Sequence, residues 1–218
     1  MLIKGCLNTY FMRLFYHLKN IGIPSLIPIV IFILFVPWLN YREYTINGID
    51  EYFHLSVIRY SQWLMPFFSV WNVMFALCEP IEADGYELFY TPHQCFKIID
   101  LLGIFGISLI FITALHILYG FILPNMWFEY IRVLSICLLF LGIVYGMTNL
   151  FKSITPTILV LILYVFGTVF TVEHEPVFLL FYIPKTMTWQ LFLEYYLVLV
   201  VMGCLFFLVG YYTSKKYY

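Results

Sequence analysis

Long apolar runs alternate with short polar segments along almost the whole chain. A helix needs about 20 residues, most of them apolar, to cross the hydrocarbon core of a membrane. The runs meet or approach that length, so the pattern predicts an all-α integral membrane protein with six transmembrane helices in a single domain. The predicted spans are 21–39, 54–78, 98–123, 130–151, 155–172 and 188–212.

The segment before the first span, 1–20, has a different pattern. Tyr10, Leu14 and Leu18 recur at helical spacing, whereas His17 belongs to a second, polar stripe. A helix with one apolar and one polar face is typical of segments that lie in the membrane interface. We therefore predict an interfacial amphipathic helix. The alternative is a simple extension of the first span.

Two connections also stand out. The loop 173–187 has an apolar centre, 177–183, bounded by Pro176 and Pro184. Seven residues cannot cross a membrane, so this loop is predicted to be a re-entrant hydrophobic element on the outer side. The other connection, 79–97, is polar and acidic and joins the second and third spans.

The distribution of lysine and arginine predicts the orientation. With the N-terminus in the cytoplasm, seven of the 11 basic residues fall in cytoplasmic segments and four at the outer side. Short cytoplasmic flanks carry an excess of Lys and Arg. Six spans then place both termini, and the loop 79–97, on the cytoplasmic side.

Composition supports lipid as the solvent for most of the chain. Among its 218 residues, 63% are hydrophobic, 22% aromatic and 11% charged. Soluble domains carry about 25% charged residues, so too little polar surface is present to cover a water-soluble globule. The net charge of −1 does not predict nucleic-acid binding. The five cysteines form neither a paired framework nor a zinc motif, and we expect no metal site.

No catalytic motif is apparent. The sequence contains no GxxxxGK phosphate loop, no HExxH and no GxSxG. We therefore expect that the chain is not an enzyme and holds no cofactor, although an intramembrane enzyme stays an alternative class.

Two polar residues within spans are candidates for a substrate pathway. His116 lies deep in the third span, and Glu194 lies about two turns into the sixth. An ionisable group within a span is costly and is a functional-site hypothesis by default. Each residue also has an interpretation without a function. His116 would form a hydrogen bond across a helix interface, and Glu194 would be shallow enough to reach water.

Two further patterns predict packing. The segment Gly142 to Gly146, "GIVYG", is a GxxxG pattern that permits close helix approach. Lys97 and Asp100 are one turn apart and form a predicted i,i+3 pair at the inner end of the third span.

The loop 79–97 has an unusual charge for a cytoplasmic segment. Four carboxylates, Glu79, Glu82, Asp84 and Glu87, stand against a single Lys97. Anionic lipids of the inner leaflet repel such a set, so a cationic groove on a partner protein is the simplest complement.

The local sequence of this loop predicts how a partner is bound. Gly85 interrupts the backbone, "YELFY" then fits a short amphipathic helix, and Pro92 ends it. Aromatic residues are enriched at interface hot spots, and Tyr86 and Tyr90 are such anchors. A solvated acidic turn is the alternative.

The segment "EADGYELFYTP" resembles the cytoplasmic signature of type-2 ABC transporter permeases. In that family a glutamate and a glycine precede a Leu-Glu-Leu-like step and a Thr-Pro pair. The matching positions here are Glu82, Gly85, Glu87, Leu88, Thr91 and Pro92. The layout of spans is also similar, and the small size resembles the permeases of bacteriocin and lantibiotic export or immunity. Ala83 and Asp84 depart from the family, which has basic residues after the first glutamate.

The resemblance implies a specific assembly. The loop would be a coupling helix that contacts a separate ABC ATPase subunit through Glu82, Gly85, Tyr86, Glu87, Leu88, Tyr90 and Pro92. Two ATPase copies, which bind ATP and Mg, would work with two permease chains in a homo- or heterodimer in the cell membrane. The spans, rich in Phe, Tyr, Leu and Ile, suit a hydrophobic or amphipathic cargo such as a peptide, a lipid-like molecule or a drug. A non-transporting scaffold that docks a cytoplasmic partner through 79–97 is the alternative.

Overall fold

The computed structural model describes residues 2–82, 94–170 and 188–216. Every regular element in these ranges is helical, which confirms the all-α prediction. The elements, with the 3₁₀ and π turns marked η, are α1 (Leu2–Ile21), η1 (Ile23–Leu26), α2 (Ile27–Val30), η2 (Ile31–Phe35), α3 (Val36–Asn47), α4 (Glu51–Ser69), α5 (Trp71–Glu82), α6 (Gln94–Gly120), α7 (Met126–Phe151), α8 (Thr155–Phe170), α9 (Trp189–Leu191), η4 (Phe192–Tyr196) and α10 (Leu197–Lys216).

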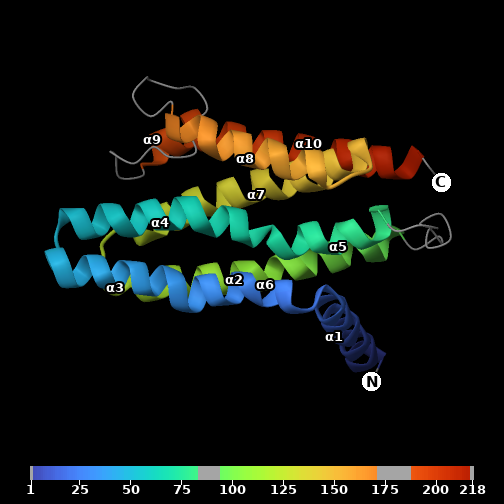
Figure 1. Ribbon diagram of the computed structural model, residues 1–218, viewed down its shortest axis with the longest axis horizontal. Coiled ribbons are helices and arrows are strands. Elements are labelled where there is room, and N and C mark those ends of the chain that lie inside the picture. Colours follow the sequence, from blue (N-terminus) through green and yellow to red (C-terminus); the bar gives the residue numbers. More distant parts are fainter. Residues whose placement is uncertain (1, 83–93, 171–187, 217–218) are drawn as a thin grey trace.

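The helices run back and forth along one axis as an antiparallel bundle (Figure 1). Helix α1, the end of α5, the start of α6, the α7–α8 turn and the end of α10 lie at one end, here called the terminal end. The α3–α4 and α6–α7 turns lie at the opposite end, here called the distal end. Helix α7 is the central element, since 78% of its apolar window is buried, against 17–39% for the other long apolar helices.

Four segments are long and apolar enough to cross a membrane. These are Ile23–Asn47, Ile98–Gly120, Met126–Phe151 and Trp189–Ser214. They correspond to the predicted first, third, fourth and sixth spans. The six-span count and the cytoplasmic placement of the termini stay predictions.

The predicted second and fifth spans are also helical over their described residues, but neither is among the four long apolar helices. The second pass is divided at Val70 into α4 and α5, and α4 carries charged and amide side chains such as Arg59 and Gln62. In the fifth, α8 extends to the limit of the described range at Phe170, and its described apolar stretch covers Thr155–Gly167.

Local sequence explains where the helices begin and end. Gly22 and Gly48 have φ of 71° and 75°, a left-handed region that costs glycine little. Gly22 therefore separates α1 from the first long helix, and Gly48 ends α3. Asp50 caps α4 by accepting a hydrogen bond from the Phe53 amide at 2.9 Å.

The glycines of α7 and α10 bring these two helices into backbone contact. A Cβ on Gly142 would overlap the Gly203 carbonyl, and one on Gly146 would lie 2.5 Å from the Phe206 carbonyl oxygen. A Cβ on Gly210 would lie 2.9 Å from the Gly146 Cα. The close approach predicted from "GIVYG" is thus confirmed, and α10 is the helix it admits.

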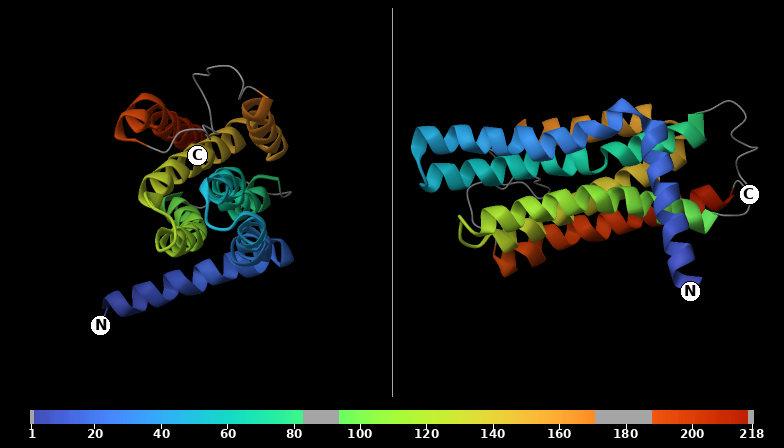
Figure 2. Two further views of the ribbon diagram at one scale, coloured as in Figure 1. Left: turned by 90° about the vertical axis from the view of Figure 1, so that its left-hand side faces the viewer. Right: turned by 90° about the horizontal axis from the view of Figure 1, so that it is seen from below.

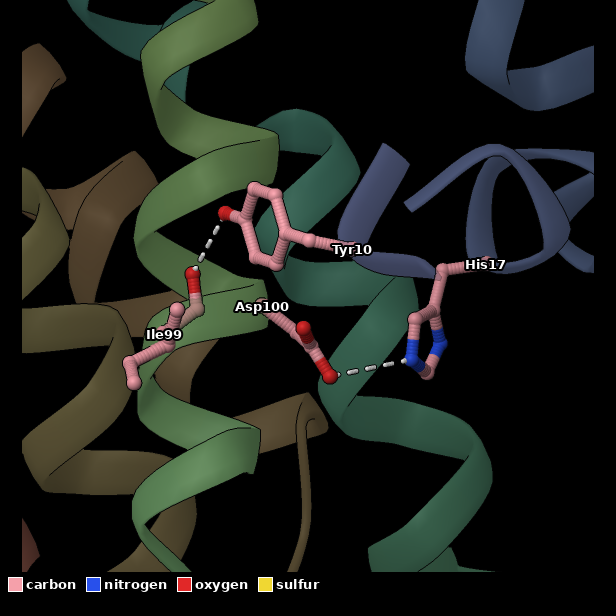
Figure 3. Close-up of polar contacts among 4 residues, drawn as sticks. All are labelled: Tyr10, His17, Ile99 and Asp100. Atoms are coloured by element: carbon pink, nitrogen blue, oxygen red, sulfur yellow. Dashed lines mark hydrogen bonds and ion pairs between the residues drawn. The ribbon is translucent and has the colours of Figure 1, made fainter. Parts of the chain in front are cut away.

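Helix α1 lies across the terminal end of the bundle, nearly perpendicular to its axis (Figure 2). Its Tyr10 hydroxyl donates to the Ile99 carbonyl at 3.1 Å (Figure 3). Leu14 of the same helix is buried. His17 Nε2 lies 3.5 Å from Asp100 Oδ2. Asp100 therefore pairs with α1, whereas the side chain of Lys97, its predicted partner, lies outside the described part. The crosswise placement fits an interfacial helix, and contact with lipid stays a prediction.

Gly103 provides the space for Tyr10, which leads to a first prediction. A Cβ there would overlap the Tyr10 hydroxyl and lie 2.9 Å from Leu14 Cδ1. We expect Gly103→Ala to displace Tyr10 and raise amide hydrogen exchange in α1 about fivefold, equivalent to about 1 kcal/mol for one lost hydrogen bond. Gly106→Ala, one turn along α6 with nothing within 4 Å of its Cβ, is the matched control. Equal exchange in the two variants would show that α1 does not depend on this contact.

Candidate functional site

A buried ion pair lies near the distal end of the central helix. Arg132 Nη1 and Glu129 Oε2 are 3.1 Å apart on adjacent turns of α7. Arg132 is 0% exposed and Glu129 is 3% exposed. Transfer of two charges out of water costs several kcal/mol for each ion, and their attraction repays it only with good geometry and further hydrogen bonds. Burial of this pair in a bundle of apolar helices is therefore an observation that calls for a functional explanation.

Two tyrosines from neighbouring helices extend this charged site. The Arg132 guanidinium lies 5.4 Å from the centre of the Tyr196 ring, a cation–π arrangement. Tyr196 is the last residue of the wide turn η4, and such π turns often occur at functional sites. Tyr164 of α8 is within electrostatic reach of Tyr196. Its hydroxyl has no hydrogen-bond partner among the described residues.

Helix α4 presents Ser61 and Gln62 toward the bundle interior. Both side chains are 1% exposed. Neither the Ser61 hydroxyl nor either amide atom of Gln62 has a hydrogen-bond partner in the described part of the chain. Pro66 adds to this deficit, because it has no N–H and so removes the helical donor of the Gln62 backbone carbonyl.

The register of α4 against α7 sets the level of Gln62. The Ser69 hydroxyl lies within hydrogen-bonding reach of the Cys137 thiol, and both helices start at the distal end. Seven residues earlier on each helix, Gln62 and Tyr130 therefore lie at about the same level, since each residue rises about 1.5 Å. Gln62 is thus at the level of the Glu129–Arg132 turn.

The third element at this level is the distal end of α6. His116 is buried, its Nδ1 lies 2.8 Å from the Ile112 carbonyl oxygen, and its ring is 5.3 Å from that of Tyr130. The Tyr130 hydroxyl lies 2.9 Å from the Thr113 hydroxyl. His116 Nε2 has no hydrogen-bond partner within the described ranges. His116 thus contacts a neighbouring helix through its ring and bonds to its own helix.

Together these side chains form what we call the polar layer. Its members are Ser61, Gln62, Thr113, His116, Glu129, Tyr130, Arg132, Tyr164 and Tyr196. Buried polar groups in native proteins are normally hydrogen-bonded, as Thr148 and Thr157 are to each other at 3.0 Å toward the terminal end. Among the described residues, the unpaired donors and acceptors of Ser61, Gln62, His116 and Tyr164 are therefore capacity for water or a passing polar group.

The structure separates the two candidates of the substrate pathway. His116 belongs to the polar layer, whereas Glu194 is exposed and accepts a hydrogen bond from Gln190 at 2.9 Å. Gln190 and Glu194 are four residues apart, so the hydrogen bond joins two side chains on the exposed face of one helix.

The predicted contact with an ATPase lies largely outside the described residues. Glu82 is the last residue of α5, and its side chain is not described. Gly85, Tyr86, Glu87, Leu88, Tyr90 and Pro92 fall outside the described ranges, as does the whole of the predicted re-entrant loop 173–187. These predictions stay open.

Sequence reasoning missed the ion pair at the centre of the polar layer. In the sequence analysis, Arg132 is only one of the four basic residues counted at the outer side to predict the orientation, and Glu129 is not used. The available signal is the order Glu-x-x-Arg within an apolar run, because residues three apart share a helix face. Two opposite charges on one face of a span predict mutual neutralisation inside the bundle.

Within the described part of the chain, no group of three or more His, Cys, Asp and Glu side chains could hold a metal ion. The chain matches no protein-family model, no curated protein and no solved structure.

Proposed function

We propose that this chain is the membrane-spanning permease subunit of an ATP-driven transporter of the ABC type. The observation that carries transport is the polar layer, because hydrogen-bonding groups with unfilled capacity inside an apolar bundle are typical of a substrate path. The ABC class rests on the resemblance of residues 82–92 to the coupling helix of type-2 permeases.

Three features of the fold support this proposal. The acidic loop follows α5 and precedes α6 in the sequence, and the adjoining ends of these two helices lie at the terminal end, where α1 also docks on α6. A movement imposed on the loop would pass into α6, which carries His116 about five turns away. The long helices have exposed apolar faces, which suit lipid and a second permease chain.

In the proposed assembly two permease chains bind two ATPase subunits, which hold ATP and Mg and hydrolyse the nucleotide. The cargo is hydrophobic or amphipathic, in keeping with the apolar and aromatic spans. Its polar groups would meet Gln62, His116 and Arg132 on the way across. The site of action is the cell membrane.

A charge reversal in the loop tests the coupling. We expect Glu87→Lys to reduce more than tenfold the amount of ABC ATPase that co-purifies with this chain from its native membrane. The acidic loop would lose its match to a cationic groove. Glu51→Lys is the matched control, since Glu51 is exposed at the distal end of the bundle.

The outcome separates the two classes. Loss of the ATPase with Glu87→Lys alone, together with ATP-driven movement of a fluorescent amphipathic peptide by the wild-type complex, supports the permease. Equal recovery of the ATPase with both variants contradicts the coupling role. A complex that depends on Glu87 yet moves neither peptide nor lipid probes identifies the scaffold alternative.

A further inference from the structure

A second feature of the distal end is a cavity that none of the preceding arguments uses. It has a volume of about 340 Å³ and opens between α3, α4 and the end of α6. This volume is within the range of small-molecule sites, about 300–1,000 Å³. The cavity is lined by Pro37, Asn40, Tyr41, Tyr44, Ile49, Phe53, Tyr119 and Ile122.

The shape of the chain around the cavity follows from its sequence. The ring of Pro37 clashes with the helical position of the carbonyl four residues earlier, and the wide turn η2 lies directly before it. Gly48 then ends α3 with a positive φ, and Asp50 starts α4. The two helices therefore leave a short turn side by side (Figure 1), and Tyr44 and Phe53 contact there at 6.0 Å between ring centres.

One amide supplies the polar feature of this apolar wall. Asn40 is 2% exposed, and its Nδ2 donates to the Tyr119 hydroxyl at 2.7 Å. The Oδ1 atom of Asn40 has no hydrogen-bond partner among the described residues. A buried polar atom without a partner is costly, so a ligand that bonds to it is favoured.

The chemistry of the wall selects the ligand. Most of the lining is aliphatic or aromatic and suits an alkyl or aryl body. Whichever end of the Asn40 amide faces Tyr119, the other end is left to bond, as a donor or an acceptor. A hydroxyl group is both donor and acceptor, so it satisfies either orientation.

We propose that this cavity is a binding site for a small amphiphile with an apolar body and one hydroxyl group, held by the amide of Asn40. The body lies between Tyr44, Phe53 and Ile122, and the hydroxyl bonds to Asn40 beside Tyr119. The site lies at the distal end of the bundle, between α3, α4 and the end of α6. Binding there requires no ATPase and no transport, so this proposal stands apart from the proposed function.

Photolabelling of the full chain in lipid nanodiscs tests the site. The probes are a diazirine-bearing octanol, its methyl ether, and a diacylglycerol with a diazirine in one acyl chain. Labelled peptides are identified by mass spectrometry. We expect the alcohol to label residues 37–53 and 119–122 about fivefold more than the ether, since one net hydrogen bond contributes about 1 kcal/mol. Preferential labelling by the diacylglycerol would identify the bilayer as the source of the ligand.

Three variants complete the test. Ile49→Trp fills the cavity and should reduce labelling by the alcohol at least fivefold. Ile46→Trp should leave it unchanged, because Ile46 has the same 64% exposure as Ile49 but does not line the cavity. Asn40→Leu should reduce labelling by the alcohol to the level of labelling by the ether. Labelling by the ether itself should not change. Helical content by circular dichroism verifies that each variant folds. Equal labelling in the two tryptophan variants, or equal labelling by alcohol and ether in the wild type, would overturn the proposal.

Discussion

Gly142→Leu is expected to destabilise the protein by about 3 kcal/mol or more, at the upper end of the cost of overpacking. The atoms that a side chain at this position would meet are the backbone atoms of Gly203, including a Cα within 2.8 Å of the new Cβ. A backbone cannot rotate away as a side chain can. The two helices must separate, and α10 then loses its packing against the centre of the bundle.

The measurement is unfolding of the purified chain by SDS in mixed micelles, followed by circular dichroism. Gly167→Leu is the matched control, since α8 has nothing within 4 Å of a Cβ at that glycine. We expect the Gly142 variant to unfold at a clearly lower SDS fraction and the Gly167 variant to behave as wild type. A Gly142 variant as stable as the control would show that close contact of α7 and α10 contributes little.

The glycines also show how far the sequence can predict packing. "GIVYG" identifies α7 as a helix that admits a close neighbour, because small residues four apart lie on one face. It does not identify the neighbour, since Gly203 and Gly210 of α10 are seven apart and form no GxxxG pattern. Only the fold shows that these two sets of glycines face each other.

The long apolar runs predict their helices because hydrophobic length is a local property. The first, third, fourth and sixth predicted spans each overlap a helix long enough to cross a membrane. The second pass is harder, because its break at Val70 and its buried polar residues depend on packing against α7. The separation of α1 from the first span is set by one residue, Gly22, whose φ of 71° interrupts the helix.

The polar layer could be predicted only in part, because burial depends on the rotation of each helix. Position in a span makes His116 and Glu194 equivalent candidates, yet one is buried and the other exposed. Gln62 carries no formal charge and has no motif, so nothing local marks it. Two features of the structure make it significant. Its side-chain amide is buried, and its backbone carbonyl receives no helical hydrogen bond because Pro66 has no N–H.

The second large effect is expected at the ion pair. Arg132→Leu should destabilise the chain by about 3–5 kcal/mol, because it leaves the buried carboxylate of Glu129 without this partner. The variant with both Arg132→Leu and Glu129→Leu should recover most of the lost stability, since a buried pair replaced by apolar residues is often neutral or stabilising. SDS unfolding of the two variants measures the difference. A double variant as unstable as the single one would mean that the two charges are not coupled.

Activity of the same double variant then separates stability from function. If the polar layer conducts the cargo, the stable double variant assembled with its ATPase should hydrolyse ATP but lose at least tenfold in ATP-driven movement of an amphipathic peptide. Arg132→Lys keeps the charge but loses the planar guanidinium, which pairs with a carboxylate and stacks on the Tyr196 ring. It should therefore retain an intermediate rate. Full transport by the double variant would assign the pair to assembly of the bundle alone, and the path of the cargo would have to lie outside the polar layer.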